Sequence, residues 1–301
     1  MIRDRNKLKN SEHAISTVVS VILLLGLAVA MMAVFNVTYI PEMKTAAEFD
    51  HMGDVYEDMS RIKSNGDIMT IAMAIDNDIF FSMDMPVRMG GGYIPIIGRD
   101  RSSSTLVVND ATVGMYITAE DQSNGTIYNY VLDDLGSIRY SSNNRYFMDQ
   151  SFVLENGALF IVQGNRSLMK LPPSMRIDLL NGSHTDVRIS VVDIFGTTGS
   201  VASNDVEYVR MESNSSNVLF NKDHLLKNMS VTIISPYPLA WSELLDSMAA
   251  KAGLVSPAEY NVTTSNNNVT LSLYSGNNES IGLYLQEHII DTRLNSVWVP
   301  Y

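Results

Sequence analysis

Residue types that support catalysis are scarce and scattered in this chain of 301 residues. The chain has no cysteine, which excludes disulfides, thiolate metal ligands, iron–sulfur clusters and a cysteine nucleophile. Its five histidines are far apart in the sequence, and no pair has the spacing of metal ligands. The patterns His-Glu-x-x-His and Gly-x-Ser-x-Gly are both missing. The sequence therefore predicts no catalytic residue, no cofactor and no metal site.

Two short motifs begin like ligand-binding loops but lack the residues that complete them. The glycines at positions 90–92 are not followed by Gly-Lys-Ser/Thr, so they predict a turn and not a phosphate-binding loop. Asp76 and Asp78 open like a calcium loop. Phe80 and Phe81 then occupy the third ligand position and the glycine position, so the motif fails.

One modification does have repeated acceptor motifs. Asn-x-Ser/Thr accepts N-linked sugar, which solubilises exposed parts of a secreted protein. Nine such triplets occur, and composition alone is the alternative explanation for that number. Asn36 is a poor candidate because it adjoins a long apolar run. We predict that several of the other eight are modified: Asn124, Asn165, Asn181, Asn214, Asn228, Asn261, Asn268 and Asn278.

The apolar run that precedes these acceptors is Ile15–Phe35, which has 21 residues and no charge. As an α-helix it rises about 31 Å, which matches the hydrocarbon thickness of a bilayer. A secretory signal usually has an apolar region of only about 7–15 residues followed by a small-x-small cleavage site, and no such site follows here. The run therefore predicts a membrane-spanning helix, with a buried core helix and a cleaved signal as the alternatives.

Charge is distributed unevenly on the two sides of this run. Residues 1–14 carry a net charge of +2, whereas the remaining 287 residues carry 17 basic and 31 acidic side chains, a net charge of −14. Short basic flanks stay in the cytoplasm. We therefore expect one pass through the cell membrane, a cytoplasmic N-terminus before any processing, and an extracellular bulk. The acidic excess also argues against nucleic acid as a partner.

The start of the apolar run resembles the N-terminal domain of archaeal type IV pilins and archaellins. The similarity covers roughly a tenth of the chain and rests on the stretch His13-Ala14-Ile15-Ser16-Thr17-Val18-Val19-Ser20-Val21-Ile22-Leu23. It implies a cut by a prepilin-type peptidase between Ala14 and Ile15, which leaves the apolar helix in the mature protein. Ala14 stands where this family often has Gly, and Val19 where many members have Glu. More loosely, Tyr140–Pro173 resembles uncharacterised archaeal surface proteins with such a head.

The next segment, residues 41–65, predicts a helical stalk. Pro41 should interrupt or kink the first helix, because it lacks an N–H donor and its ring clashes with the preceding turn. Asn65-Gly66 should end the stalk. Between them an apolar stripe either docks on the chain's own outside domain or forms a seam with neighbouring subunits. Its residues are Phe49, Met52, Val55, Tyr56, Met59 and Ile62.

Beyond the stalk, short β-rich runs alternate with turn signals. Asn156-Gly157 and Asn181-Gly182 predict hairpins, because both central residues of a type I′ turn need positive φ. One helix should begin at Pro238 and end at Gly253. The predicted strands are Ile68–Ile75, Thr105–Val108, Gly114–Thr118, Thr126–Leu132, Ser137–Ser141, Ser151–Leu154, Ala158–Val162, Met175–Leu180, Asp186–Asp193, Val206–Met211, Met229–Ile234, Val269–Tyr274 and Ile281–Gln286.

The expected fold class is an N-terminal transmembrane α-helix and helical stalk, followed by a mainly β, antiparallel and sandwich-like extracellular domain with one short helix. The expected divisions are a basic head or prepilin leader (residues 1–14), a transmembrane or pilin-type helix (15–40), the stalk (41–65) and the β-rich domain (66–301). A change of composition near residues 214–228 predicts a split of this domain into two lobes.

These features favour a glycosylated, membrane-anchored surface protein with a structural or adhesive role and no enzymatic activity. After a cut at Ala14, its helix is expected to pack with copies of itself or with other pilin-like subunits in a filament. Gly26, Ala30 and Ala33 belong to a stripe of small residues that permits close helix approach. The alternatives are a single-pass receptor or binding module that is not assembled, and a membrane-tethered hydrolase with a site built from distant loops.

We predict that the mature protein begins at Ile15, because a small residue precedes the uncharged helix there. Mass spectrometry of the N-terminal peptide, from cells with an active prepilin-type peptidase, measures this directly. A chain that still starts at Met1 would remove the filament interpretation. A start beyond Phe35 would indicate an ordinary secreted protein.

Overall fold

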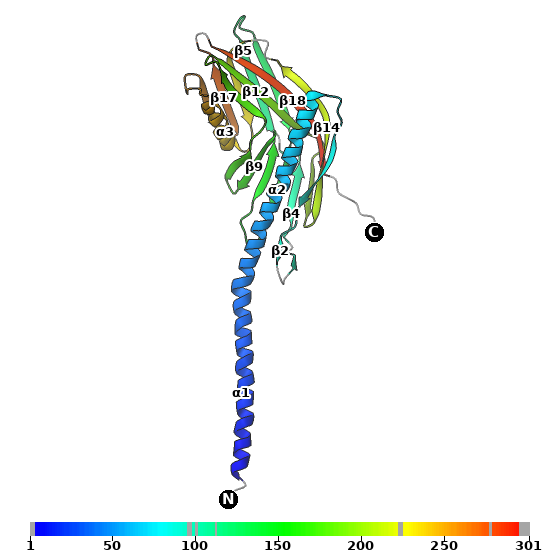
Figure 1. The fold of residues 1–301 in the computed structure, drawn as a ribbon, viewed down its shortest axis with the longest axis vertical. Coiled ribbons are helices and arrows are strands. Elements are labelled where there is room, and N and C mark those ends of the chain that lie inside the picture. The colour runs from blue at the N-terminus through cyan, green and yellow to red at the C-terminus, as the bar shows by residue number, and fades with distance from the viewer. Residues whose placement is uncertain are drawn as a thin grey trace.

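The computed structural model describes residues 4–94, 98–99, 102–111, 113–221, 225–276 and 279–294. A very long N-terminal helix leads into a β-rich body, which carries one further helix (Figure 1). The body contains two mainly antiparallel sheets and a small separate hairpin. The expected order of a long apolar helix followed by a mainly β, antiparallel domain with one short helix is confirmed.

The long helix consists of α1 (Asp4–Val34), a π-helical segment η1 (Phe35–Tyr39) and α2 (Ile40–Ile75), which follow one another without a break. The interruption expected at Pro41 takes the form of this π-helical segment. The N–H of Ile40 donates to the carbonyl of Phe35, five residues back, so the wider turn lies directly before the proline. Pro41 itself lies in the first turn of α2, where its missing N–H costs little.

The expected stop at Asn65-Gly66 is wrong, and so is the predicted strand Ile68–Ile75, because α2 continues through both. Glycine inside a helix costs about 1 kcal/mol relative to alanine. Gly66 is buried, however, and the Sδ-methyl of Met211 lies 3.5 Å from where its Cβ would be. Met69 and Met73, beyond the glycine, are also buried. Burial of their side chains, at about 2 kcal/mol each, favours continuation of the helix.

The larger sheet has ten strands, with a main order of β1-β14-β18-β15-β17-β16. β12 joins β18 in parallel and carries β11, while β5 joins β15 and carries β6. The bounds are β1 Ser82–Arg88, β5 Val113–Asp121, β6 Ile127–Leu135, β11 Met175–Leu180, β12 His184–Phe195, β14 Val206–Phe220, β15 Leu226–Ile234, β16 Tyr260–Ser265, β17 Asn268–Tyr274 and β18 Ser280–Leu294.

The smaller sheet has six strands in the order β10-β9-β8-β7-β4-β13. Tyr93–Ile94 (β2) and Gly98–Arg99 (β3) form the separate hairpin. Helix α3 (Pro238–Lys251) appears where the sequence predicts it. The bounds of the smaller sheet are β4 Ser104–Val108, β7 Ser137–Ser142, β8 Ser151–Glu155, β9 Ala158–Gln163, β10 Arg166–Leu171 and β13 Gly199–Ser203.

Both predicted hairpins are confirmed, with φ of 43° and 71° at Asn156-Gly157 and of 54° and 69° at Asn181-Gly182. Every predicted strand other than Ile68–Ile75 overlaps a strand of the structure. Six strands were not predicted: β2 and β3 form the separate hairpin, and β1, β10, β13 and β16 lie at the ends of the two main strand orders. Residues 214–228 include the end of β14 and the start of β15, and both of these strands pair with β18 in the larger sheet.

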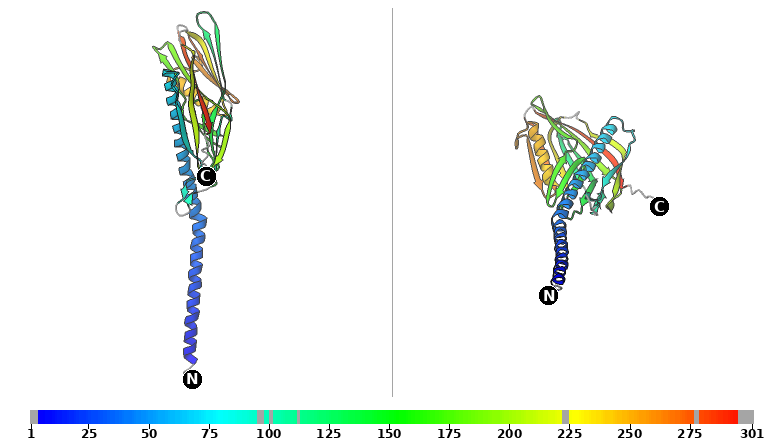
Figure 2. Two further views of the ribbon diagram at one scale, coloured as in Figure 1. Left: turned by 90° about the vertical axis from the view of Figure 1, so that its right-hand side faces the viewer. Right: turned by 60° about the horizontal axis from the view of Figure 1, so that its bottom comes forward.

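Helix α2 lies along one face of the body, and α1 projects beyond it (Figure 2). The apolar stripe of α2 packs on the chain's own sheets, because Met52, Val55, Met59 and Ile62 are buried in a core shared with strands of both sheets. Phe49, at the start of the stripe, is 60% exposed. The same core contains further methionines, whose flexible side chains fill the irregular space between a helix and twisted sheets. They are Met69, Met73, Met85, Met89 and Met211.

Candidate functional site

The candidate site is the exposed part of the long helix and the contacts that join this helix to the body. Residues 17–39 are all exposed, although most are apolar. Within the described residues this is the one helix long and apolar enough to cross a membrane; its best window has a mean hydropathy of 2.9 and no buried residue. Exposed apolar surface in water costs about 25 cal/mol per Å². The segment is suited to cross a membrane or to act as a signal sequence.

The predicted packing residues Gly26, Ala30 and Ala33 lie on one face of α1, because residues three and four apart are neighbours on a helix. No atom lies within 4 Å of the position that a Cβ on Gly26 would occupy. This face is therefore open to close approach by another helix.

The expected cleavage position lies further back, between Ala14 and Ile15, within the helical backbone of α1. The side chains at these two positions lie outside the part of the chain that the structure describes.

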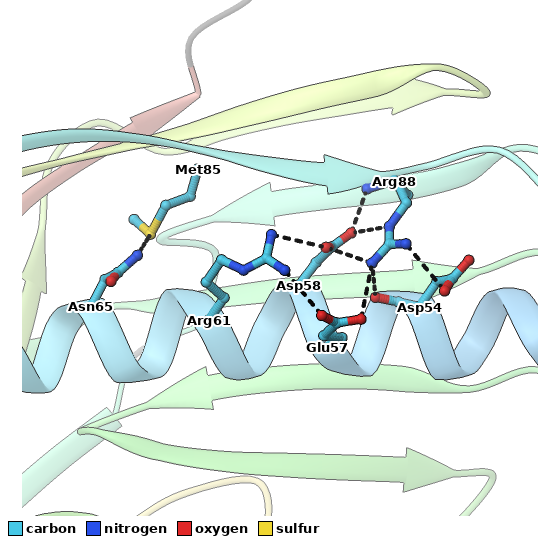
Figure 3. Close-up of polar contacts among 7 residues, drawn as sticks. All are labelled: Asp54, Glu57, Asp58, Arg61, Asn65, Met85 and Arg88. Atoms are coloured by element: carbon cyan, nitrogen blue, oxygen red, sulfur yellow. Dashed lines mark hydrogen bonds and ion pairs between the residues drawn. The ribbon is translucent and has the colours of Figure 1, made fainter.

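An arginine of β1 clamps α2 to the larger sheet (Figure 3). Arg88 donates from Nε and Nη2 to the two carboxylate oxygens of Asp58, at 2.8 Å each, and its backbone N–H donates to the same carboxylate at 3.0 Å. Nη2 also donates to the carbonyl oxygen of Asp54 at 2.8 Å. The side chain of Asp58 is only 3% exposed. A bidentate pair of this kind fixes the relative orientation of the two side chains as well as the distance between them.

The charges around this clamp support it. Asp54 adds an ion pair to Arg88 at 3.1 Å, and Glu57 lies 3.8 Å from it. Hydrogen bonding to Asp58 raises the pKa of Arg88 above its usual value. Arg61 occupies the outer side of the cluster and pairs with Glu57 at 3.1 Å (Figure 3). The sequence does not reveal this pairing, because Asp58 and its partner in β1 are thirty residues apart.

A second contact, nearer the N-terminal end of α2, is a fully buried carboxylate. Glu48 accepts the backbone N–H groups of Arg145, Tyr146 and Phe147, at 2.9, 2.7 and 2.5 Å. Three donors satisfy a buried charge that would otherwise be costly. The loop between β7 and β8 is thereby held against the helix. No local pattern in the sequence reveals this contact, because its two sides are about a hundred residues apart.

A buried polar chain joins α2 to the smaller sheet. The Tyr140 hydroxyl lies 3.3 Å from Nε2 of His51 and 2.6 Å from the Ser104 hydroxyl. Burial lowers the pKa of His51, and burial raises the pKa of Tyr140 to about 12. All three side chains are at most 4% exposed. The chain therefore cross-links elements of the core and does not present a nucleophile at the surface.

A buried carboxylate also secures α3. Glu155 accepts hydrogen bonds from the Ser235 hydroxyl and from Nε1 of Trp241, the latter at 2.8 Å. Its side chain is 1% exposed, and burial raises its pKa to about 6. Trp241 is fully buried in the second core, between α3 and the sheets. This contact fixes how α3 covers the end of β8.

The glycosylation candidates have different environments. Asn124, Asn165 and Asn181 are exposed in turns. The other described candidates lie in strands, where Asn214 and Asn268 are exposed and Asn261 is half-buried. Nδ2 of half-buried Asn228 donates to Glu120 at 2.7 Å. Asn278 lies outside the described residues, and Nδ2 of Asn36 donates to the Met32 carbonyl within the helix.

Over the part of the chain that the structure describes, no group of three His, Asp or Glu side chains is placed to hold a metal ion. No known family model matches the chain, and no curated protein matches it. Its class is therefore defined by architecture alone: a long apolar N-terminal helix that continues into a β-rich body.

We predict that Asp58→Asn lowers the free energy of unfolding by about 2 kcal/mol, because it removes the charge from a buried hydrogen-bonded pair. It should also increase amide hydrogen exchange in α2 around Val55–Ile62. Denaturant unfolding and hydrogen-exchange mass spectrometry measure the two effects.

The matched control is Glu57→Gln, at a carboxylate that is 65% exposed and should change stability by less than about 0.5 kcal/mol. Equal effects of the two substitutions would show that the Asp58–Arg88 pair is not a clamp.

Proposed function

We propose that this chain is a single-pass, pilin-like protein of the cell surface, with a structural or adhesive role. The observation that carries the proposal is that the exposed apolar helix is continuous with α2, which the body holds through the Arg88–Asp58 clamp and a shared core. Helix and body thus move as one unit, as an anchored surface subunit requires. The N-terminal resemblance to archaeal pilins supports the same class.

In this proposal the basic head stays in the cytoplasm until a prepilin-type peptidase cuts after Ala14, and the body lies outside the cell. The distribution of charge supports this orientation. The partners are the membrane, the peptidase and copies of the chain or other pilin-like subunits, which would meet the helix through the face of Gly26, Ala30 and Ala33. The body's net charge of −14 disfavours nucleic acid. The proposal assigns no catalytic residue.

A groove favours a second candidate function, a single-pass receptor or binding module that is not assembled. It has a volume of about 620 Å³ and lies between α2 and β8–β10. Phe49, Tyr56 and Phe152 line it together with Lys170. Gly53 opens one side, because no atom lies within 4 Å of where its Cβ would be. Aromatic walls with a few polar groups are typical of ligand sites.

Glycosylation is part of the proposal, and the structure allows the acceptors to be ranked. We predict sugar at Asn124, Asn165 and Asn181, whose side chains are exposed in turns. We predict none at Asn228, because it is half-buried in β15 between β5 and β17 and its Nδ2 is already held by Glu120. Glycopeptide mass spectrometry of native material tests both parts. Unmodified peptides at all three turn sites would contradict the proposal, and sugar at Asn228 would contradict the ranking.

Filament assembly is tested in the membrane helix. We predict that Gly26→Leu with Ala33→Leu abolishes surface fibres, because helices in lipid associate through close packing of small residues. Electron microscopy of cells counts the fibres, and secretion and protease resistance of the body report its folding.

The control variant is Ala28→Leu, which adds a similar bulk two residues from Gly26, on nearly the opposite face of the helix. Fibres that persist in the double variant would show that this face does not pack. A wild type that is cut at Ala14 yet forms no fibres would favour the unassembled receptor.

A further inference from the structure

The loop between β7 and β8, residues 143–150, lies close to the membrane end of the body. Glu48 binds its backbone, and no charged residue occurs between Ile15 and Pro41. Lys44 follows Tyr39, the exposed aromatic residue at the end of the apolar segment, by about 8 Å of helical rise. Lipid headgroups extend several Å beyond the hydrocarbon core. The side chains of Lys44 and of this loop are therefore charged donors close to the lipid.

Two cations flank one tyrosine ring in this region. Nζ of Lys44 lies 4.8 Å from the centroid of the Tyr146 ring and 3.5 Å from its hydroxyl. The guanidinium carbon of Arg145 lies 5.8 Å from the same centroid. The ring therefore holds two positive charges close together, with a hydroxyl beside them, through attraction to its π face.

No described carboxylate forms an ion pair with Lys44 or Arg145. Elsewhere in the described chain, seven arginines do pair with Asp or Glu: Arg61, Arg88, Arg139, Arg176, Arg188, Arg210 and Arg293.

Among the described residues, the neighbouring acids Glu48 of the helix and Asp149 of the loop accept hydrogen bonds from other donors and form no ion pair with these two cations. Glu48 is fully engaged by three N–H groups, and Asp149 accepts the N–H of Asn144 at 2.8 Å. Glu42 lies two residues from Lys44 on α2, so the two side chains point in different directions. In a body with a large acidic excess, this leaves two adjacent positive charges available at its base.

We propose that Lys44 and Arg145 bind the phosphate of lipid headgroups in the outer leaflet and so set the height and tilt of the body above the membrane. The inference rests on the proposed function, because it requires the apolar helix to span the bilayer. A phosphate suits two cations and a hydroxyl, and arginine presents a fork of donors to it. Lysine can extend its charge down to the headgroups along an apolar stem.

The surroundings fit a lipid surface. Met148, in the same loop, is 56% exposed, and the ring pair of Phe35 and Tyr39 lies where aromatic residues gather at membrane interfaces. An acidic body is repelled by an anionic membrane. A local pair of cations reverses that repulsion at one point, and each cation near such a surface strengthens binding about fivefold.

The test uses the full chain in lipid nanodiscs, with a bimane label on Met148→Cys and a nitroxide on the lipid headgroups. The chain has no native cysteine, so the label is unique. We expect strong quenching in phosphatidylglycerol discs and little quenching of a label on Gln122→Cys, in the turn between β5 and β6. Lys44→Gln with Arg145→Gln should reduce quenching at position 148 to the level of that reference.

The matched control is Arg166→Gln with Lys170→Gln, which removes two other exposed cations, on β10, and should leave quenching at position 148 unchanged. Retained quenching in the Lys44/Arg145 variant would overturn the inference. Absent quenching in the wild type, with inorganic phosphate protecting residues 143–150 from hydrogen exchange, would assign the cations to a free anion and also overturn it.

Failure of the proposed function can be distinguished from failure of the lipid contact. A chain without a spanning helix would not be retained in the discs. A chain that is inserted but shows no quenching at position 148 overturns only the lipid contact. Thermal unfolding of both double variants confirms that the body is folded.

Discussion

The packing of α2 against both sheets is the contact on which the rest of the structure depends. Val55, Met59 and Ile62 are fully buried in a core that also takes side chains from the larger and the smaller sheet, so the helix is a structural wall of the body. A core of this kind loses several kcal/mol when one large side chain is removed. Because α2 continues α1 directly, the fold of the body and the position of the apolar segment are fixed by the same contact.

Polar contacts fix the orientation of α2 against the sheets. Apolar surfaces slide past one another at little cost, whereas the Arg88–Asp58 pair and the three bonds to Glu48 each allow one arrangement. The two contacts are ten residues apart on α2, and they bind strand β1 and the loop after β7. Together they define the rotation of the helix relative to the body, and hence which face of the apolar segment points in which direction.

The sequence was most informative where local chemistry decides the structure. The uncharged run, the Asn-Gly hairpins and α3 follow from periodicity and turn residues, as do nearly all the inner strands. The prediction of a strand at Ile68–Ile75 was wrong because its isoleucines favour strands. In the structure, burial of Met69 and Met73 in the core extends the helix through this segment. Edge strands such as β10, with Arg166 and Lys170 exposed, lack a strong apolar pattern. Contacts such as that of Glu48 with residues 145–147 leave no signal in the sequence, because only the tertiary fold brings these distant residues together.

The way in which α2 attaches has a mechanical consequence. The helix lies along the body over most of its length and is not joined to it end-on (Figure 2). A pull along the helix axis therefore loads the buried side chains and the arginine clamp in shear, with many contacts sharing the force at once. Peeling would break them one after another and needs far less force. A body attached in this way resists separation from its own apolar helix when the two are pulled apart along the helix axis.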